Sequence, residues 1–215
     1  MTYSQSPLAS DYAWGTKNSN PRTNATYNPT GQITVITIHH MAAVWTAKQC
    51  ADYHHNRNYS SANYYIGKNG EILSGVPESR RAWTSGSQKN DYKAINIEVS
   101  NCKGSPNWEV SDVCVESTIR LCVDICQRNG IKQLQFTGNA NGNLTMHCYF
   151  QATACPGPYF KNKFSYVQQE VNRRLGNPEP EKLYRVQVGA FAKKENAEKL
   201  AAELTKKGYP TIIVS

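Results

Sequence analysis

The sequence TMHCYFQATACPGP, at residues 145–158, cannot form one regular helix, and the predicted fold is built around this loop. Gly157 and the proline on each side of it interrupt helical structure. His147 and Cys155 can therefore approach each other only through a loop. Imidazole and thiolate are both good zinc ligands, but a catalytic zinc ion usually takes three protein ligands and leaves one position to water. The pattern predicts a metal site with a third ligand elsewhere in the chain.

The best candidate for the third ligand comes from the run ITVITIHH at residues 33–40. This short, β-branched run is typical of a central strand, and its last residues lie where a strand meets a loop. His39 is therefore well placed to be the ligand. A lone histidine on a strand is more often structural, and a lone cysteine is more often a small buried hydrophobic residue. Only the combination of His39, His147 and Cys155 favours a metal site.

These motifs carry a family resemblance. A strand ending in IHH, a later segment AINIEVSN at residues 94–101 and a final H-x7-C-P-G pattern resemble the zinc-dependent N-acetylmuramoyl-L-alanine amidases of the type-2 amidase and peptidoglycan-recognition superfamily. The resemblance covers roughly the first four fifths of the chain. It implies one Zn²⁺ per chain held by His39, His147 and Cys155, with His40 facing the other way as a structural residue. It also implies cleavage of the amide between N-acetylmuramic acid and L-alanine by zinc-activated water.

Glu98 is the predicted general base. Residues 94–101 alternate with period two, which puts Ile95, Ile97 and Val99 on one face and Asn96, Glu98 and Ser100 on the other. A glutamate within an otherwise apolar strand is costly to bury without a partner, so it indicates a cation or a chemical role. The resemblance assigns the base to this position in family members that lack a catalytic tyrosine. The alternative is a buried glutamate paired with an arginine or a backbone donor.

A hairpin is predicted at residues 61–73, SANYYIGKNGEIL, with its turn at Asn69 and Gly70. In the family this strand borders the active-site groove, and many relatives carry a catalytic tyrosine on it. Alignment on Gly70 puts Ala62 at the tyrosine position, which removes one expected group. The resemblance makes the residues that follow, Asn63 and Tyr64, candidates for substrate binding.

Two further site residues follow from the resemblance. Trp83, in RAWTSGS, resembles a groove-lining tryptophan and is a candidate for substrate contact, although it can equally fill the core. Thr153 falls where some relatives have a catalytic lysine and others a threonine, and it can donate a hydrogen bond without adding charge. We therefore count Thr153 with Glu98 as catalytic. Asn63 is the alternative to Thr153 as the second group that stabilises the oxyanion.

Alternating strands and helices predict an α/β fold with a central mixed β-sheet flanked by helices. Thr46 and Gln49 form a predicted capping box, and long helices are expected at residues 111–129 and near residues 158–175. His54 and the histidine after it are interpreted as structural, because consecutive helical residues diverge by about 100° and cannot chelate one ion. Of the seven cysteines, Cys114, Cys122 and Cys126 recur at helical spacing and are interpreted as reduced core residues.

The chain is predicted to divide into a catalytic domain at residues 1–176, a linker at residues 177–182 and a small β-α-β unit at residues 183–215. The segment NPEPE marks the linker. The segment YRVQVGAF, at residues 184–191, resembles the opening of SPOR domains, which bind peptidoglycan glycan strands. A complete SPOR domain has two such units, so one copy leaves a bare sheet edge. We therefore expect a homodimer through residues 183–215.

Charge and composition limit the partners. The net charge of +8 is spread along the chain without basic runs, which favours an anionic cell wall over nucleic acid, although ordinary solubility also accounts for it. The sequence has no run of eighteen or more apolar residues, so no membrane-spanning helix is predicted. The first ten residues, MTYSQSPLAS, do not resemble a secretory signal. Together with the wall-degrading chemistry and the small C-terminal binding module that the resemblance implies, the missing secretory signal predicts a phage or prophage endolysin, made in the bacterial cytoplasm and released to the wall through a separate pore protein.

Two other interpretations remain open from sequence alone. A non-catalytic peptidoglycan-recognition protein would keep the groove and lose metal ligands, whereas His39, His147 and Cys155 are all present. A scaffolding protein that assembles through its C-terminal unit would leave the metal pattern unexplained.

Overall fold

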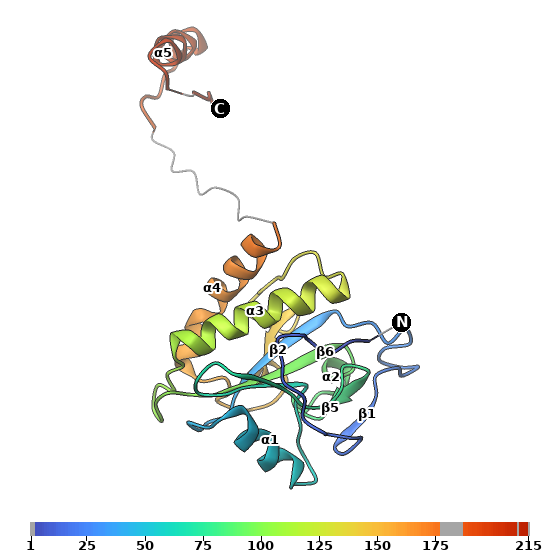
Figure 1. Cartoon of the computed structure of the whole chain (residues 1–215). Coiled ribbons are helices and arrows are strands. Elements are labelled where there is room, and N and C mark those ends of the chain that lie inside the picture. The colour runs from blue at the N-terminus through green and yellow to red at the C-terminus, as the bar shows by residue number, and fades with distance from the viewer. Residues whose placement is uncertain (1–2, 177–186, 210, 215) are drawn as a thin grey trace. The chain divides into compact units, whose positions relative to one another are not determined.

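The computed structural model describes residues 3–176, 187–209 and 211–214. The chain forms two compact units, Met1–Glu179 and Pro180–Ser215, and each is described by itself (Figure 1). The predicted linker at residues 177–182 lies outside the described residues.

A five-stranded mixed sheet forms the centre of the first unit, in the order β4-β3-β6-β2-β7. β3, β6, β2 and β7 run parallel to one another, and β4 pairs antiparallel with β3 as the predicted hairpin. The predicted α/β fold with a central mixed sheet is therefore confirmed. The strands are β2 (Val35–His40), β3 (Tyr64–Ile66), β4 (Ile72–Ser74), β6 (Ala94–Val99) and β7 (Leu144–Met146).

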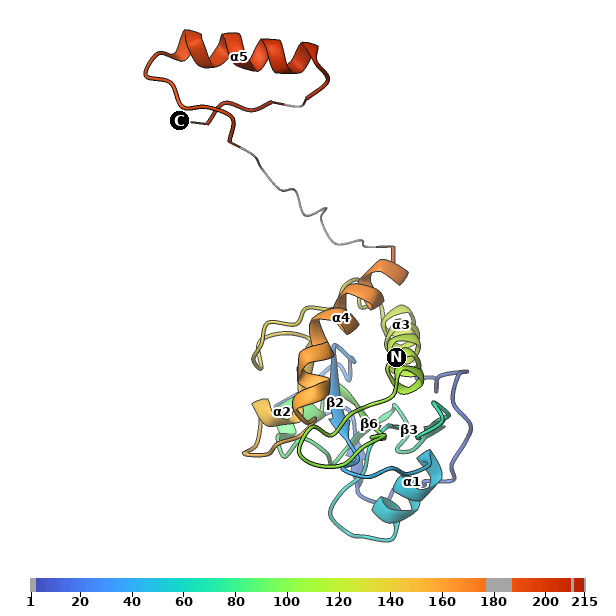
Figure 2. The ribbon, with the colours of Figure 1, turned by 90° about the vertical axis from the view of Figure 1, so that its left-hand side faces the viewer.

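Because side chains alternate with period two along each strand, the two faces of the sheet pack against different helices. The isoleucines of β2 and β6 lie in one core cluster with residues of α3 (Asp112–Asn129) and α4 (Pro158–Arg174). The opposite face carries Tyr65, which clusters with residues of α1 (Ala47–His55). Figure 2 shows the sheet between α1 and the α3–α4 pair. The polar residues of β2 and β6 therefore share a face with α1.

The helix ends follow the expected chemistry. Thr46 and Gln49 form the predicted capping box at the start of α1. Gly130 ends α3 in the left-handed conformation, with φ of 68°, which a glycine adopts without strain. Pro158 occupies the first turn of α4, where its missing N–H costs nothing. The helix expected at residues 111–129 begins one residue later, and Ser111 precedes it without capping it, because its hydroxyl donates to the Cys114 sulfur.

Residues 1–32 show no sustained periodicity, which predicts an extended lead-in on the domain surface, but the structure gives them a larger role. β1 (Ser19–Pro21) pairs antiparallel with β5 (Arg80–Ala82) in a separate two-stranded sheet. Trp14 is 2% exposed and Arg22 is fully buried. The Arg22 guanidinium donates to backbone carbonyls that include those of Glu78, Arg80 and Ala94. Because one side chain joins several loops, the lead-in forms part of the core structure, which the lack of periodicity in the sequence did not indicate.

The second unit contains one described helix, α5 (Lys194–Lys206). The first predicted strand of this unit falls mainly on residues outside the described part of the chain, and residues 211–214 do not form the second one. Val188, Tyr209 and Ile212 are each more than half exposed. A strand requires a neighbour for its backbone hydrogen bonds, and no such neighbour is present among the described residues of this unit.

The cysteines do not form disulfides, and all seven are free thiols. Cys114, Cys122 and Cys126 are buried on α3 in the main core cluster, as their spacing predicted. Among the described residues, no helix combines the length and the apolar character that crossing a membrane requires.

Candidate metal centre

The structure brings His39, His147 and Cys155 together. His39 lies near the carboxyl end of β2, and His147 follows β7, the parallel neighbour of β2. Cys155 lies in the loop before α4, eight positions after His147, so only His39 comes from a distant part of the chain. Their ligand atoms all lie within 4.8 Å of one another. The Cys155 sulfur is 3.8 Å from Nδ1 of His39.

This donor set fits one metal ion. Nitrogen and sulfur ligands around a tetrahedral zinc ion stand about 3.3–3.6 Å apart, given metal–ligand distances of about 2.0–2.3 Å. The 3.8 Å separation of His39 Nδ1 and Cys155 Sγ is close to this range. Burial raises the pKa of the Cys155 thiol, and the backbone N–H of His40 donates to its sulfur at 3.4 Å. A nearby cation favours the thiolate form of such a buried cysteine.

A hydrogen-bonded chain behind His39 sets which ring nitrogen faces the cluster. His39 Nε2 lies 3.0 Å from Oδ1 of Asn96, whose Nδ2 donates to Oδ1 of Asp91 at 3.1 Å. Because Asn96 uses its amide nitrogen toward the Asp91 carboxylate, its oxygen accepts from His39, and Nε2 carries the proton. Nδ1 is then the free ligand atom. Such partners orient metal-binding histidines. Asn96 shares the polar face of β6 with Glu98, and this alternation was the only sequence signal for it.

Burial lowers the pKa of His39 to about 3, with a smaller effect from the neighbouring His147. The imidazole is therefore neutral across the physiological range, which is the form that binds metals. His40 lies on the other side of the strand, where its ring packs edge-on against Trp108 with centroids 5.3 Å apart. This placement agrees with the structural role predicted for His40.

Glu98 lies next to the cluster on the same face of the sheet. The strand register pairs it with His39 of β2 on one side and with Tyr65 of β3 on the other. Its side chain is 8% exposed, and its Oε2 has no hydrogen-bond partner among the described residues. Burial raises the pKa of Glu98 to about 8. The alternative of a glutamate paired with an arginine is not what the structure shows.

The cluster opens into a cavity of about 470 Å³. Glu98, His147, Cys155 and Thr153 all line it. The Thr153 hydroxyl oxygen accepts a hydrogen bond from the backbone N–H of Cys155 at 3.2 Å. The hydroxyl proton of Thr153 therefore remains available as a donor to a molecule in the cavity.

Three predicted substrate-binding residues do not line the cavity. Asn63 and Tyr64 are fully buried, and their side chains hydrogen-bond within the protein, to Val76 and Glu78 among other residues. Trp83 donates from Nε1 to Asn20 in the two-stranded region. Tyr64 points to the α3 face of the sheet, because it alternates with Tyr65. The predicted hairpin strand is therefore present, but the Tyr64 side chain lies on the face away from the cavity.

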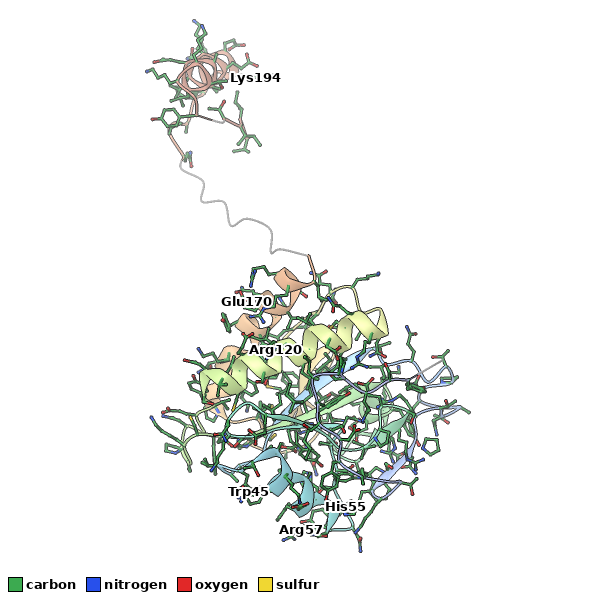
Figure 3. All side chains as sticks on the ribbon, in the orientation of Figure 1. Trp45, His55, Arg57, Arg120, Glu170 and Lys194 are labelled. Atoms are coloured by element: carbon green, nitrogen blue, oxygen red, sulfur yellow. The ribbon has the colours of Figure 1, made fainter. Side chains whose placement is uncertain are left out.

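Residues of the α1 region form the wall that the sequence did not predict. Trp45, Tyr53 and His54 line the cavity, and the Trp45 and Tyr53 rings lie 5.3 Å apart. In Figure 3, Trp45 marks the start of α1, and Arg57 lies just beyond its end. His54 was interpreted as structural, whereas its ring borders the same cavity as Glu98. Aromatic residues at helical spacing resemble a stripe of core residues, so the sequence did not indicate that these side chains line a cavity.

The fold and the site together define a class: α/β proteins with a candidate metal centre of two histidines and one cysteine beside a buried carboxylate, at the carboxyl edge of parallel strands. Residues 29–158 match the family model described as N-acetylmuramoyl-L-alanine amidase. Since this match covers more than half of the chain, the protein belongs to the N-acetylmuramoyl-L-alanine amidase family. Residues 180–215 match the model of the SPOR domain. No protein with a curated description matches the chain.

Solved structures of similar fold include several amidases. The Staphylococcus aureus hydrolase AmiA, in complex with its ligand, shares 16% identity at a TM-score of 0.58, over 82% of this chain and 89% of its own. The amidase LysC from Clostridium intestinale shares 22% identity at a TM-score of 0.52, over 74% and 95%. The PlyG catalytic domain shares 16% identity at a TM-score of 0.54, over 72% and 87%. These likenesses establish the fold.

Proposed function

We propose that the protein is a zinc-dependent peptidoglycan hydrolase that cleaves the amide between N-acetylmuramic acid and L-alanine. Family membership supports the amidase activity. The observation that carries the zinc dependence is the cluster of His39, His147 and Cys155 beside the unpartnered carboxylate of Glu98. Soft sulfur together with imidazole nitrogen suits zinc better than the oxygen-preferring ions.

Each residue at the cavity has a separate role in the proposed reaction. A zinc ion held by His39, His147 and Cys155 would supply a Lewis acid that acidifies water and polarises the amide carbonyl. Glu98 accepts a proton from the attacking water and delivers it to the leaving nitrogen of L-alanine. Thr153 donates its hydroxyl proton toward the carbonyl oxygen as negative charge develops there. A carboxylate beside a cation ionises more readily than one that is only buried, which suits Glu98 to the role of base.

Digestion of purified cell walls tests this proposal. The wild-type protein is expected to clear a wall suspension and to release new L-alanine amino termini without new reducing sugar ends. Glu98→Gln should retain the metal and lose activity by a factor of about 100 or more, because a general base contributes about 10²–10⁴-fold. Cys155→Ala should lose the metal as well. An active Glu98→Gln variant, or a protein that binds walls without cleaving them, would contradict the proposal.

We further propose that the chain acts as a phage or prophage endolysin that is made in the bacterial cytoplasm. Its support is the fold that it shares with proteins such as the endolysin LysCS of Clostridium intestinale, at a TM-score of 0.51. Expression of the protein alone should leave host cells intact, and coexpression with a pore-forming protein should lyse them. Lysis without the pore protein would contradict this proposal.

For the second unit we propose binding to glycan strands and pairing with a second copy of the chain. The match to the SPOR model supports the first role. The exposed Val188, Phe191 and Ile212 support the second, because unpaired apolar residues favour a partner surface. A chain shortened to residues 1–176 should cleave soluble muramyl dipeptide as well as the full chain but sediment less with insoluble walls. Light scattering should give a dimeric mass for the full chain, and a monomeric mass would contradict the pairing.

A further inference from the structure

His54 combines three features that the mechanism above does not use. Its ring lines the same cavity as Glu98, His147 and Cys155. Its Nδ1 lies 3.0 Å from the hydroxyl oxygen of Tyr65. Its Nε2 has no hydrogen-bond partner among the described residues and is not one of their buried unpartnered atoms, so this nitrogen is accessible on a residue that lines the cavity. A polar atom held at a cavity wall in this way is available to a bound molecule.

Tyr65 fixes which nitrogen of His54 carries the proton. The tyrosine oxygen already accepts a hydrogen bond from the backbone N–H of Ala62 at 2.9 Å. Its own proton then has His54 Nδ1 as its acceptor. The imidazole is neutral, because burial lowers the pKa of His54 to about 4. Nδ1 therefore accepts, and Nε2 carries the hydrogen and presents an N–H donor to the cavity.

The sheet register places this donor across Glu98 from the metal cluster. His39, Glu98 and Tyr65 lie side by side on three neighbouring strands and share one face. Adjacent strands are about 4.8 Å apart, so two spacings of about 5 Å separate the strand of His39 from that of Tyr65. α1 packs on β3, and thereby holds His54 above Tyr65. An amide that lies over Glu98 thus has the three ligands on one side and His54 on the other.

We propose that His54 is a further catalytic residue, whose Nε2–H donates a hydrogen bond to the carbonyl oxygen of the amide being cleaved. This inference rests on the proposed function and adds a donor to it. The position where many relatives carry a tyrosine is Ala62 here, which is fully buried and contributes its backbone N–H to the Tyr65 hydroxyl. A histidine from α1 and a tyrosine from β3 thereby supply the neutral donor that the side chain of Ala62 does not.

Steady-state cleavage of muramyl dipeptide tests the proposal. His54→Ala should lower kcat about 100-fold or more with little change in KM, because the bond strengthens as charge develops on the oxygen. His54→Gln, which restores an N–H donor, should recover part of the loss. Tyr65→Phe should lower kcat less, and it should add little to the loss already caused by His54→Ala. A non-additive pair would show that Tyr65 acts through His54.

The adjacent residue provides a matched control. His55 is on the same helix, but its ring packs on Trp14 and Tyr12 and does not line the cavity. His55→Ala should therefore keep its kcat. Zinc content and the thermal midpoint are measured for every variant. An unchanged kcat in His54→Ala, or a fall that follows loss of zinc or of folded protein, would overturn the proposal.

A spectroscopic measurement separates this inference from the proposed function. Nitrogen-15 NMR of histidine-labelled wild-type protein should show His54 as the neutral tautomer protonated at Nε2, and Tyr65→Phe should shift the population toward the Nδ1-protonated form. The opposite tautomer in the wild type would overturn the inference. If the wild type does not cleave the amide, the proposed function has failed, and this measurement alone decides whether Tyr65 fixes the state of His54.

Discussion

At the scale of single residues, His39 shows how a side chain is prepared for a metal ion. Burial keeps its imidazole neutral, and the pKa is lowered to about 3. Asn96 and Asp91 hold the Nε2 proton, which leaves Nδ1 directed to Cys155. The ligand could be predicted from the sequence, because the motif ends in HH after a β-branched run. Its partners could not, because the alternation that puts Asn96 on the polar face of its strand does not show which side chain it bonds to.

Removal of the Asn96 side chain should weaken metal binding. Asn96→Ala deletes the acceptor that fixes the His39 tautomer, and loss of such a partner typically costs 10- to 100-fold in metal affinity. Chelator competition measures the affinity. Asn172→Ala is the matched control, because Asn172 is an equally buried amide that bonds to Leu134 in another part of the domain. Equal zinc affinity in Asn96→Ala and the wild type would contradict this role.

The partly buried His54 should make stability depend on pH. Its pKa is near 6.5 in an unfolded chain and about 4 in the folded protein, where burial disfavours the charged form. Below pH 6.5 the unfolded state takes up a proton that the folded state does not. The free energy of unfolding contributed by this group is therefore full above pH 6.5 and falls as the pH drops toward 4, by at most about 1.4 kcal/mol per pH unit.

His54→Gln should reduce this slope. Denaturant unfolding of the two proteins at several pH values between 7 and 4 measures the difference between them. His39 and His40 also have lowered pKa values, so the wild-type slope exceeds the contribution of His54 alone. Identical pH dependence in wild type and variant would contradict the account of a neutral, partly buried His54.

At the scale of elements, parallel pairing does most to assemble the site. β2, β6 and β7 end at the same edge of the sheet, which puts His39, Glu98 and His147 within one region. Helices and strands with clear periodicity were predictable, and so was the capping box at Thr46. The direction of Tyr64 and the cavity wall from α1 were not predictable, because both depend on tertiary packing. A one-residue difference in alignment moves a strand residue to the other face.

The packing of residues 1–32 on the domain, and with it the stability of the protein, should depend on Arg22. Arg22→Met keeps much of the side-chain length but leaves several buried carbonyls without their donor, so the free energy of unfolding should fall by about 3 kcal/mol or more. Denaturant unfolding measures the loss. Arg120→Met is the control on the exposed face of α3, where the change should stay within about 0.5 kcal/mol. Equal stability of the two variants would contradict the role of Arg22.

At the scale of the whole molecule, the chain joins an amidase unit to a short segment that matches the SPOR model. The first unit has its own buried core on both faces of the sheet. α5 in the second unit has no buried residues, and the apolar residues near it are exposed. The alternation of residues 184–188 and 211–214 predicted a β-α-β order; residues 211–214 form no strand, and most of the first expected strand lies outside the described residues.

The central claim is that one zinc ion binds to three side chains of the first unit, and elemental analysis of metal-reconstituted protein after removal of free metal tests it most directly. The account predicts one zinc ion per chain in the wild type and in Glu98→Gln, and a large loss in Cys155→Ala. A wild-type protein without stoichiometric zinc, or a Cys155→Ala variant that retains it with equal affinity, would contradict the account.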